Sequence, residues 1–91
     1  MPGMKPRGPD RRSARLVLYT RSGCHLCDVM QSELRAGLGV DFPVEIVDIA
    51  GSAELTRRYG EHVPVLTDGE TELCRGRYDA RKVAAYLSEI R

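Results

Sequence analysis

Two cysteines three positions apart, Cys24 and Cys27, are the residues of this sequence best suited to chemistry. They follow an apolar stretch that turns through Ser22 and Gly23, so they fall at a predicted junction between a strand and a helix. At such a helix start the free N–H groups and the helix dipole favour a thiolate over a thiol. A thiolate is the form that attacks disulfides, so the sequence predicts a redox-active dithiol.

A structural zinc site is the alternative interpretation of this pair. Four-coordinate zinc needs two further ligands, and the sequence offers only Cys74, His62 and carboxylates. No second Cys-x-x-Cys and no pair of histidines is present, which favours redox chemistry. Cys74 stands alone in a predicted strand, where a cysteine usually behaves as a small buried hydrophobe.

Two charged neighbours are candidates to modulate the pair. His25 follows Cys24 directly, and its imidazolium form would favour the thiolate and make the disulfide more oxidising. Arg21, three residues before Cys24, would stabilise the thiolate or bind a substrate carboxylate. The alternative for each is an exposed side chain with little effect on the chemistry.

The elements that position the cysteines follow from hydrophobic patterning. The continuous apolar run 16–19 predicts a buried central strand. A helix is expected from Cys24 to about residue 36, ended by Gly37 and Gly39. A second strand is expected over 44–49, and the interval is long enough for a helical crossover, so the two strands should be parallel.

The second half of the chain predicts a short helix, two strands and a last helix. Ser52 is a plausible cap for the short helix, which should end at Tyr59 and Gly60. Strands are expected over 63–67 and 71–75, the latter at a sheet edge, joined by a loop of three or four residues around Asp68 and Gly69. Asp79 should cap a helix whose apolar stripe has helical spacing, made of Val83, Tyr86, Leu87 and Ile90.

Length and composition indicate one soluble globular domain. Apolar residues make up 42% of the 91 residues and charged residues 30%. We expect a disordered tail over 1–14 and a domain over 15–91. The tail carries four basic residues and one acidic residue, so with an overall charge of +1 the domain has a charge of −2. A mildly acidic domain argues against nucleic-acid binding.

The sequence contains no run of about 18 apolar residues that would span a membrane. Its basic N-terminus lacks the apolar core of a secretory signal. An odd number of cysteines, two of them in Cys-x-x-Cys, does not suggest a disulfide framework. We therefore expect a cytoplasmic protein, and we expect it to be a monomer.

Three blocks of sequence resemble a small bacterial glutaredoxin-like family of the thioredoxin fold. The blocks are Leu-Tyr-Thr-Arg-Ser-Gly-Cys-His-Leu-Cys (18–27), Val-Pro-Val-Leu (63–66) and Gly-Arg-Tyr-Asp (76–79). The resemblance covers residues 16–90 and implies a three-layer α/β fold in the order β-α-β-α-β-β-α, with a central mixed four-stranded sheet. The sequence differs from most glutaredoxins in having His25 and Leu26 between the cysteines, where Pro-Tyr is usual.

The resemblance also assigns roles to the cysteines and to residues around them. It implies that Cys24 is the attacking thiolate and Cys27 the resolving thiol. It implies that Pro64 is cis and that the backbone of Val63 pairs with an extended substrate.

Three further positions match residues that glutaredoxins use for their substrates. Arg21 matches a basic residue of the family. Gly76 and Asp79 match the segment that receives the γ-glutamyl end of glutathione, at a helix start where an anion meets free N–H groups.

The function expected from these features is that of a thiol–disulfide oxidoreductase. It would reduce disulfide-containing proteins or glutathione mixed disulfides, with no bound cofactor and no metal. Its electrons would come from glutathione as co-substrate or from a thioredoxin-type reductase. The alternative is a non-catalytic binding module of the same fold, which holds an iron–sulfur cluster or zinc through Cys24 or acts as a redox adaptor.

Overall fold

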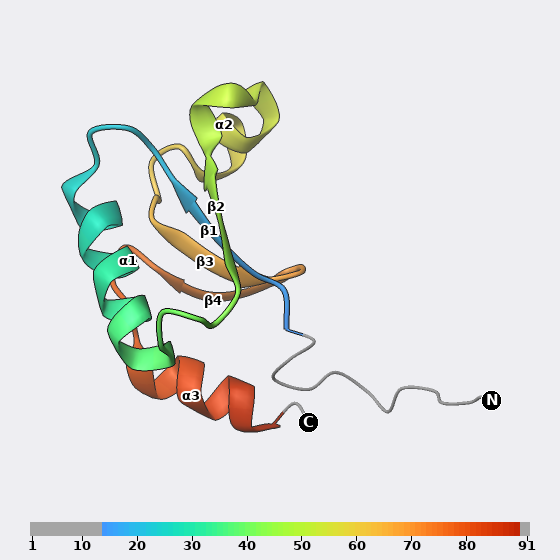
Figure 1. Ribbon diagram of the computed structural model, residues 1–91. Coiled ribbons are helices and arrows are strands. Elements are labelled where there is room, and N and C mark those ends of the chain that lie inside the picture. The colour runs from blue at the N-terminus through green and yellow to red at the C-terminus, as the bar shows by residue number, and fades with distance from the viewer. Residues whose placement is uncertain (1–13, 90–91) are drawn as a thin grey trace.

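The computed structural model describes residues 14–89 and places eight elements along them (Figure 1). In chain order these are β1 (Leu16–Thr20), α1 (His25–Leu38), β2 (Val44–Asp48), the 3-10 turn η1 (Ile49–Gly51), α2 (Ala53–Tyr59), β3 (Val65–Asp68), β4 (Thr71–Arg75) and α3 (Ala80–Glu89). The predicted order of strands and helices is confirmed. The predicted tail lies outside the described residues except for Ala14, which is buried in the core.

The four strands form one mixed sheet in the order β2-β1-β3-β4. β1 pairs in parallel with β2, as predicted, and antiparallel with β3, which in turn pairs antiparallel with β4. β1 therefore lies inside the sheet, hydrogen-bonded on both sides, while β4 is an edge strand. The loop that follows β1 and leads to Cys24 at the start of α1 consequently leaves the sheet from a central strand.

The core lies between the sheet and the two longer helices. Side chains of β1, β3 and β4 pack there against side chains of α1 and α3; the buried members include Leu16, Leu18, Met30, Leu34, Leu66, Leu73, Val83 and Leu87. Figure 1 shows α1 and α3 on the same side of the strands. These helices bury one apolar stripe each, which is the usual way an amphipathic helix is fixed on a sheet.

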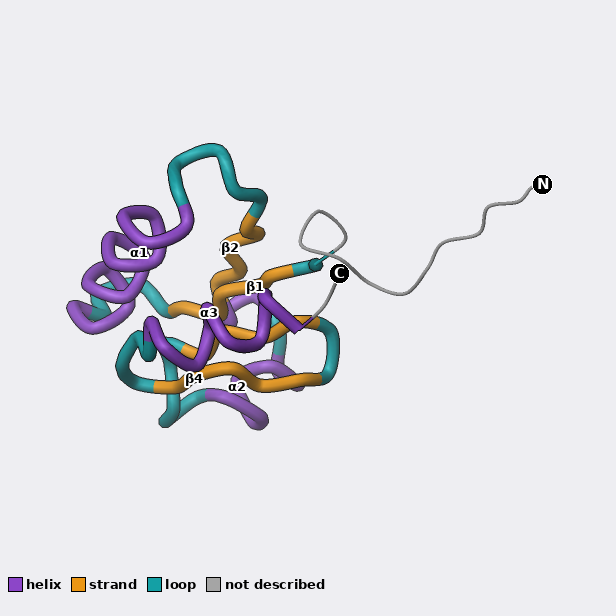
Figure 2. Tube along the Cα trace, turned by 90° about the horizontal axis from the view of Figure 1, so that it is seen from below, coloured by secondary structure: helices purple, strands orange, loops and turns teal. Residues whose placement is uncertain are grey.

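α2 belongs to the opposite layer. Tyr19 of β1 points away from the face that carries Leu18, because neighbouring strand residues alternate between faces. Its ring stacks on that of Tyr59, with 4.5 Å between ring centroids. The Cα trace in Figure 2 shows α1 and α2 on opposite sides of the strands. The three-layer arrangement expected from the sequence is therefore present.

Both predicted helix caps are confirmed. The Oγ of Ser52 accepts a hydrogen bond from the Leu55 N–H at 3.1 Å, and Asp79 Oδ1 accepts one from the Lys82 N–H at 3.0 Å. Each bond satisfies one of the N–H groups that a helix start leaves without a partner in the helix.

α1 is longer than predicted, because Gly37 does not end it. The helix continues to Leu38 and is ended by Gly39, whose φ of 96° suits a residue without a side chain. The reason is a tertiary contact: the Tyr78 ring lies over Gly37, where a Cβ would come within 3.2 Å of the phenol oxygen. The absence of a side chain at Gly37 leaves room for this ring.

The turn between β3 and β4 is shorter than predicted, with only Gly69 and Glu70 between the strands. Asp68 remains in the sheet, because its carboxylate accepts a hydrogen bond from the Arg15 N–H at 2.9 Å and one from the Tyr86 hydroxyl at 2.6 Å. These contacts come from residues distant in the sequence. They hold Asp68 in β3, so β3 pairs with β4 through one residue more than predicted. The bond to Asp68 also raises the pKa of Tyr86.

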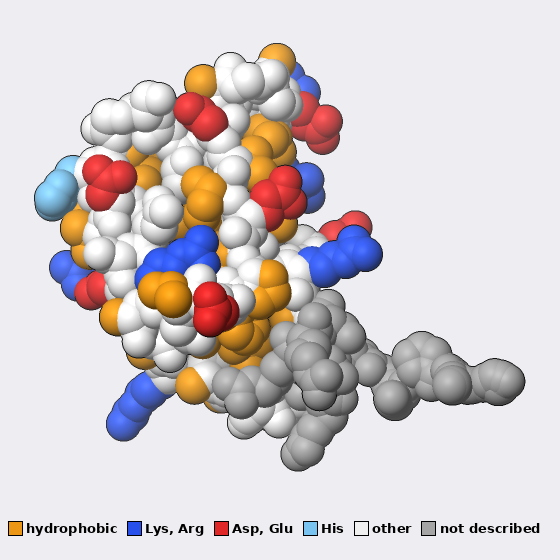
Figure 3. Space-filling model, in the orientation of Figure 1, with side chains coloured by type: hydrophobic (Ala, Val, Ile, Leu, Met, Phe, Trp, Pro, Cys, Tyr) orange, Lys and Arg blue, Asp and Glu red, His pale blue; other side chains and the backbone are white. Residues whose placement is uncertain are grey.

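The surface carries charges of both signs. On the face drawn in Figure 3, acidic and basic side chains are interspersed among apolar ones. Among the helices of residues 14–89, none combines the length and the apolar character that crossing a bilayer requires.

Replacing Leu34 with Ala should lower the free energy of unfolding by about 3 kcal/mol, because this fully buried side chain fills the space between α1 and the sheet. Urea denaturation followed by circular dichroism measures the change. Val40→Ala is the matched control, since the Val40 side chain is 77% exposed. Equal effects of the two substitutions would contradict the proposed core.

Candidate redox site

Cys24 is the N-cap residue of α1. Its backbone is extended, and its Sγ accepts a hydrogen bond from the Cys27 N–H at 3.1 Å. The preceding loop turns sharply, with a bond from the Cys24 N–H to the Arg21 carbonyl and with Gly23 at a φ of 76°, a conformation that favours glycine. The sulfur therefore lies at the positive end of the helix dipole, as predicted.

Cys24 and Cys27 are joined in a disulfide, with their Cα atoms 5.2 Å apart. Their accessibility differs: Cys24 is half-buried, whereas Cys27 is only 2% exposed. A substrate sulfur can approach Cys24 but not Cys27. This asymmetry is what a dithiol pair needs if one cysteine attacks and the other resolves.

The Val63–Pro64 peptide bond is cis, as the family resemblance implied. Pro64 is buried, and its carbonyl accepts a hydrogen bond from the Gly76 N–H at 2.8 Å. This bond joins the loop before β3 to the loop after β4. Pro64 and Gly76, two of the predicted substrate-binding residues, are thus direct neighbours.

Only part of the Val63 backbone, which we expect to pair with a substrate, is available for hydrogen bonding. Its N–H donates to the Tyr59 carbonyl at 3.1 Å, so α2 already uses this group and β3 begins only at Val65. Within residues 14–89 the Val63 carbonyl receives no hydrogen bond, which leaves it as the backbone group available to an extended ligand.

Arg21 is exposed, and its guanidinium is already engaged. Its Nη1 donates to the Gly60 carbonyl at 2.8 Å, which ties the loop before α1 to the end of α2. Next to it, Ser22 Oγ donates to the Asp48 carboxylate at 3.2 Å. The cysteine loop is therefore held on two sides by other segments. Gly60 and Asp48 were not recognised from sequence, because their partners lie 39 and 26 residues away.

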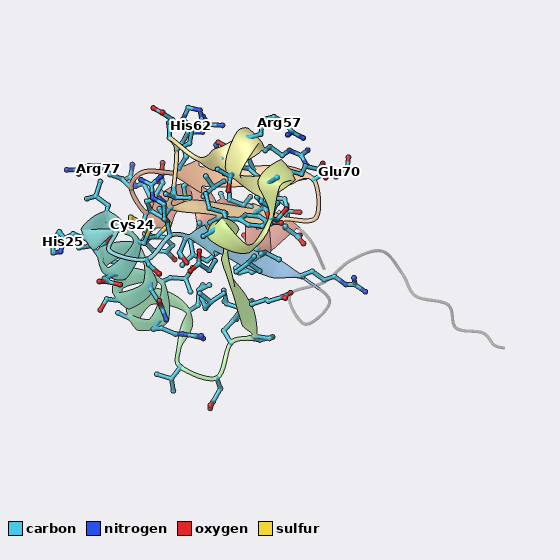
Figure 4. The ribbon with its side chains drawn as sticks, turned by 90° about the horizontal axis from the view of Figure 1, so that it is seen from above. Cys24, His25, Arg57, His62, Glu70 and Arg77 are labelled. Atoms are coloured by element: carbon cyan, nitrogen blue, oxygen red, sulfur yellow. A yellow bond between two sulfur atoms is a disulfide. The ribbon has the colours of Figure 1, made fainter. Side chains whose placement is uncertain are left out.

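His25 occupies the first turn of α1 and is exposed. Figure 4 shows its side chain pointing away from the body of the domain. Asp79 is a predicted substrate-binding residue. One of its carboxylate oxygens already accepts a hydrogen bond as the cap of α3. His62 is exposed on the loop before Pro64.

Cations gather around the start of α3. A shallow hollow of about 510 Å³ is bordered by β4, the loop after it and the first turn of α3. Its lining includes the cations Arg77, Arg81 and Lys82, the acidic Asp79, and Arg75, which is already paired with Glu72 at 2.7 Å. Gly76, in the same loop, has a φ of 77°. A concave surface of this charge would attract an anionic group.

Cys74 is buried and free, as predicted. Burial raises the pKa of its thiol, because an apolar environment disfavours the thiolate. No group of three or more histidine, cysteine or acidic side chains is arranged for a metal ion within the described part of the chain.

In the reduced protein Cys24 should be alkylated by iodoacetamide with a midpoint below the free-thiol value of about pH 8.5, because the helix start stabilises its thiolate. Cys74 should react slowly and only at higher pH, since its pKa is raised. Alkylation rates at each pH, mapped by peptide mass, test both statements. A Cys24 midpoint at or above the free-thiol value would contradict the electrostatic argument.

A four-stranded mixed sheet, a Cys-x-x-Cys pair at its first strand-to-helix junction and a cis-proline before its third strand define a glutaredoxin-type protein of the thioredoxin fold. Comparison with protein families agrees: residues 15–88 match the model of the glutaredoxin-like domain (DUF836). The chain belongs to this family.

Two solved structures are similar to the chain over nearly their whole length. The solution structure of protein Ne2328 from Nitrosomonas europaea is 38% identical, with a TM-score of 0.71, and the match covers 93% of this chain and 99% of that one. The X-ray structure of protein XcR50 from X. campestris is 36% identical, with a TM-score of 0.64 and coverage of 80% and 95%. No curated protein matches the chain.

Proposed function

We propose that this protein is a thiol–disulfide oxidoreductase that reduces disulfides in proteins or mixed disulfides of glutathione. The observation that carries the proposal is the pair of cysteines at the start of α1, one accessible and one buried, joined in a disulfide. Membership of the glutaredoxin-like family supports it. A reducing compartment such as the cytoplasm would suit this activity.

The reaction starts from the reduced pair. The Cys24 thiolate attacks one sulfur of the substrate disulfide, forms a mixed disulfide with it, and releases the other substrate sulfur as a thiolate. The Cys27 thiol then loses its proton and attacks Cys24 Sγ, which releases the second substrate thiolate and closes the Cys24–Cys27 disulfide. Two electrons pass from the protein to the substrate.

The second step is fast because it is intramolecular. Cys27 is held within the same helical turn as Cys24, so its effective concentration is far above that of any external thiol. Two molecules of glutathione, or a thioredoxin-type reductase, would return two electrons and regenerate the dithiol. Glutathione acts here as a co-substrate and not as a bound cofactor.

The neighbouring residues would tune and direct this reaction. Charged His25 would favour the Cys24 thiolate through its position in the same first turn. Arg21 would act through the loop that it fixes to Gly60. Near Gly76, the cations around the start of α3 would attract a substrate carboxylate, and the Asp79 carboxylate would attract a substrate ammonium group. The carbonyl of Val63, which accepts no hydrogen bond from residues 14–89, would pair with an extended substrate.

Cys24→Ser should abolish disulfide reduction, because no other accessible thiol lies at the helix start. Cys27→Ser should accumulate a mixed disulfide on Cys24, because the resolving thiol is missing. Turnover of an insulin disulfide and intact mass measure the two effects, with Cys74→Ser as the matched control of unchanged activity. Wild-type turnover in both active-pair variants would disprove the mechanism.

Equilibration in glutathione redox buffers should convert the dithiol reversibly into the Cys24–Cys27 disulfide, seen by intact mass as a loss of two hydrogen atoms, with the two electrons taken up by oxidised glutathione. Glutathione adducts on Cys24 at intermediate ratios would support glutathione as electron donor, and their absence a reductase protein. A pair that neither oxidises nor takes up glutathione would argue against catalysis and for the binding-module alternative.

A further inference from the structure

We propose that Asp48 is a positioning residue for Cys24: its carboxylate holds the turn before α1 in the conformation that brings the Cys24 sulfur to the helix start. The inference rests on the proposed function and deepens it, because it names a residue outside the cysteine motif that sets the reactivity of the attacking cysteine. Asp48 takes no direct part in the chemistry and acts through Ser22.

Asp48 lies beside the cysteine loop because of the register of the sheet. It is the last residue of β2 and is paired with Thr20, the last residue of β1. Since these strands are parallel, their ends meet at the same edge of the sheet. Figure 1 shows the chain leaving β2 towards α2 at the end of the sheet from which the β1–α1 loop also starts. The fold thus brings together Ser22 and Asp48, which are 26 residues apart in the sequence.

The two carboxylate oxygens of Asp48 have different partners. Oδ1 accepts a hydrogen bond from the Ala50 N–H at 2.9 Å and caps the 3-10 turn η1. Oδ2 accepts one from the Ser22 hydroxyl at 3.2 Å. The first bond orients the carboxylate against η1, whose Ile49 side chain is fully buried, so the second bond ties Ser22 to a part of the chain that the core holds in place.

Ser22 belongs to the turn that determines where Cys24 enters α1. The Cys24 N–H donates to the Arg21 carbonyl at 3.2 Å, so Ser22 and Gly23 are the central residues of this turn. The turn ends at the N-cap residue Cys24, whose Sγ accepts the Cys27 N–H at 3.1 Å. A turn held at Ser22 keeps this sulfur over the free N–H groups of the helix start, which stabilise its thiolate.

A second contact holds the same turn from the other end of the η1–α2 segment. Arg21 Nη1 donates to the Gly60 carbonyl at the end of α2, and Thr56 Oγ1 joins α2 to η1 through the Ile49 carbonyl at 2.9 Å. η1 and α2 therefore form one support that holds two neighbouring residues of the turn. Only the Asp48 contact uses a side chain of this support, so it can be removed by substitution.

Charge and position predict opposite effects of Asp48 on the Cys24 thiol. A nearby negative charge disfavours a thiolate, so loss of the Asp48 charge alone would lower the pKa of Cys24. Loss of the support would raise this pKa, because the sulfur would spend less time over the N–H groups of the helix start. The sign of the change therefore separates a positioning role from a purely electrostatic one.

In the reduced full-length protein, Asp48→Ala should raise the pKa of Cys24 by about half a unit, the size expected for the loss of one exposed hydrogen bond. Ser22→Ala removes the same contact and leaves the cap of η1 intact, so it should give a similar rise. The double variant should give no further rise, since both substitutions remove one interaction. The pH dependence of alkylation by iodoacetamide, mapped by peptide mass, measures each pKa.

Asp48→Asn is the conservative variant and should give no rise in the pKa of Cys24. Its amide oxygen can accept the Ala50 N–H, and its NH₂ group can donate to the Ser22 oxygen, so both contacts survive without the charge. Glu45→Ala is the matched control for a charge lost from the same strand. Glu45 is exposed and lies opposite Val17, three residues before the end of β1, so this variant should keep the wild-type pKa.

A fall or no change in the pKa of Cys24 in both alanine variants would overturn the inference. A rise in Asp48→Ala that Ser22→Ala does not reproduce would assign the effect to the cap of η1 and overturn it too, as would an equal rise in Asp48→Asn. Ser22→Ala, an exposed substitution, decides the outcome if Asp48→Ala does not fold. Reduction of no disulfide by the wild-type protein would instead remove the proposed function, while the pKa comparison would still decide whether Asp48 positions the Cys24 sulfur.

Discussion

The hydrogen bond from the Cys27 N–H to Cys24 Sγ is the contact on which the site depends. It begins α1 at a sulfur, so the accessible cysteine lies where the helix dipole favours negative charge. The same start directs Cys27, Met30 and Leu34 towards the sheet, since they follow at helical spacing. The residue at which α1 begins therefore sets both the electrostatic environment of the Cys24 sulfur and the side chains that α1 packs into the core.

The surroundings of the disulfide are assembled by contacts between loops. Arg21 fixes the cysteine loop to the end of α2 through Gly60, and Gly76 is bonded to the carbonyl of Pro64. These bonds link the β1–α1, α2–β3 and β4–α3 loops into a frame, so that segments from three parts of the chain keep constant positions relative to one sulfur. Such preorganisation lowers the conformational entropy that these loops would have to give up when a substrate binds.

The features that would serve the proposed chemistry are separate from those that would select the substrate. Thiol–disulfide exchange needs only the two cysteines and the helix start. Under the proposed function, the surfaces around them would select the substrate, through the cations around the start of α3 and the carbonyl of Val63. Substitutions on these surfaces would then change the substrate without changing the reaction.

The sequence by itself determined the parts that rest on local interactions. The spacing of Cys24 and Cys27, the caps at Ser52 and Asp79 and the apolar periods of the strands act over a few residues. The cysteine pair and the caps were predicted in their observed places, and the strands to within about two residues at their ends. The resemblance to glutaredoxins added the cis-proline, which local physics alone would not favour. Together these were sufficient for the order of elements and for the position of the redox pair.

Only the tertiary structure decided the parts that depend on distant partners. α1 passes through Gly37 because the Tyr78 ring packs there, and the β3–β4 turn is short because Asp68 is held from both ends of the chain. The guanidinium of Arg21 is engaged by a carbonyl 39 residues away. The conformational preferences of single residues carry no information about such contacts, because the contacts form only when distant segments come together in the folded chain.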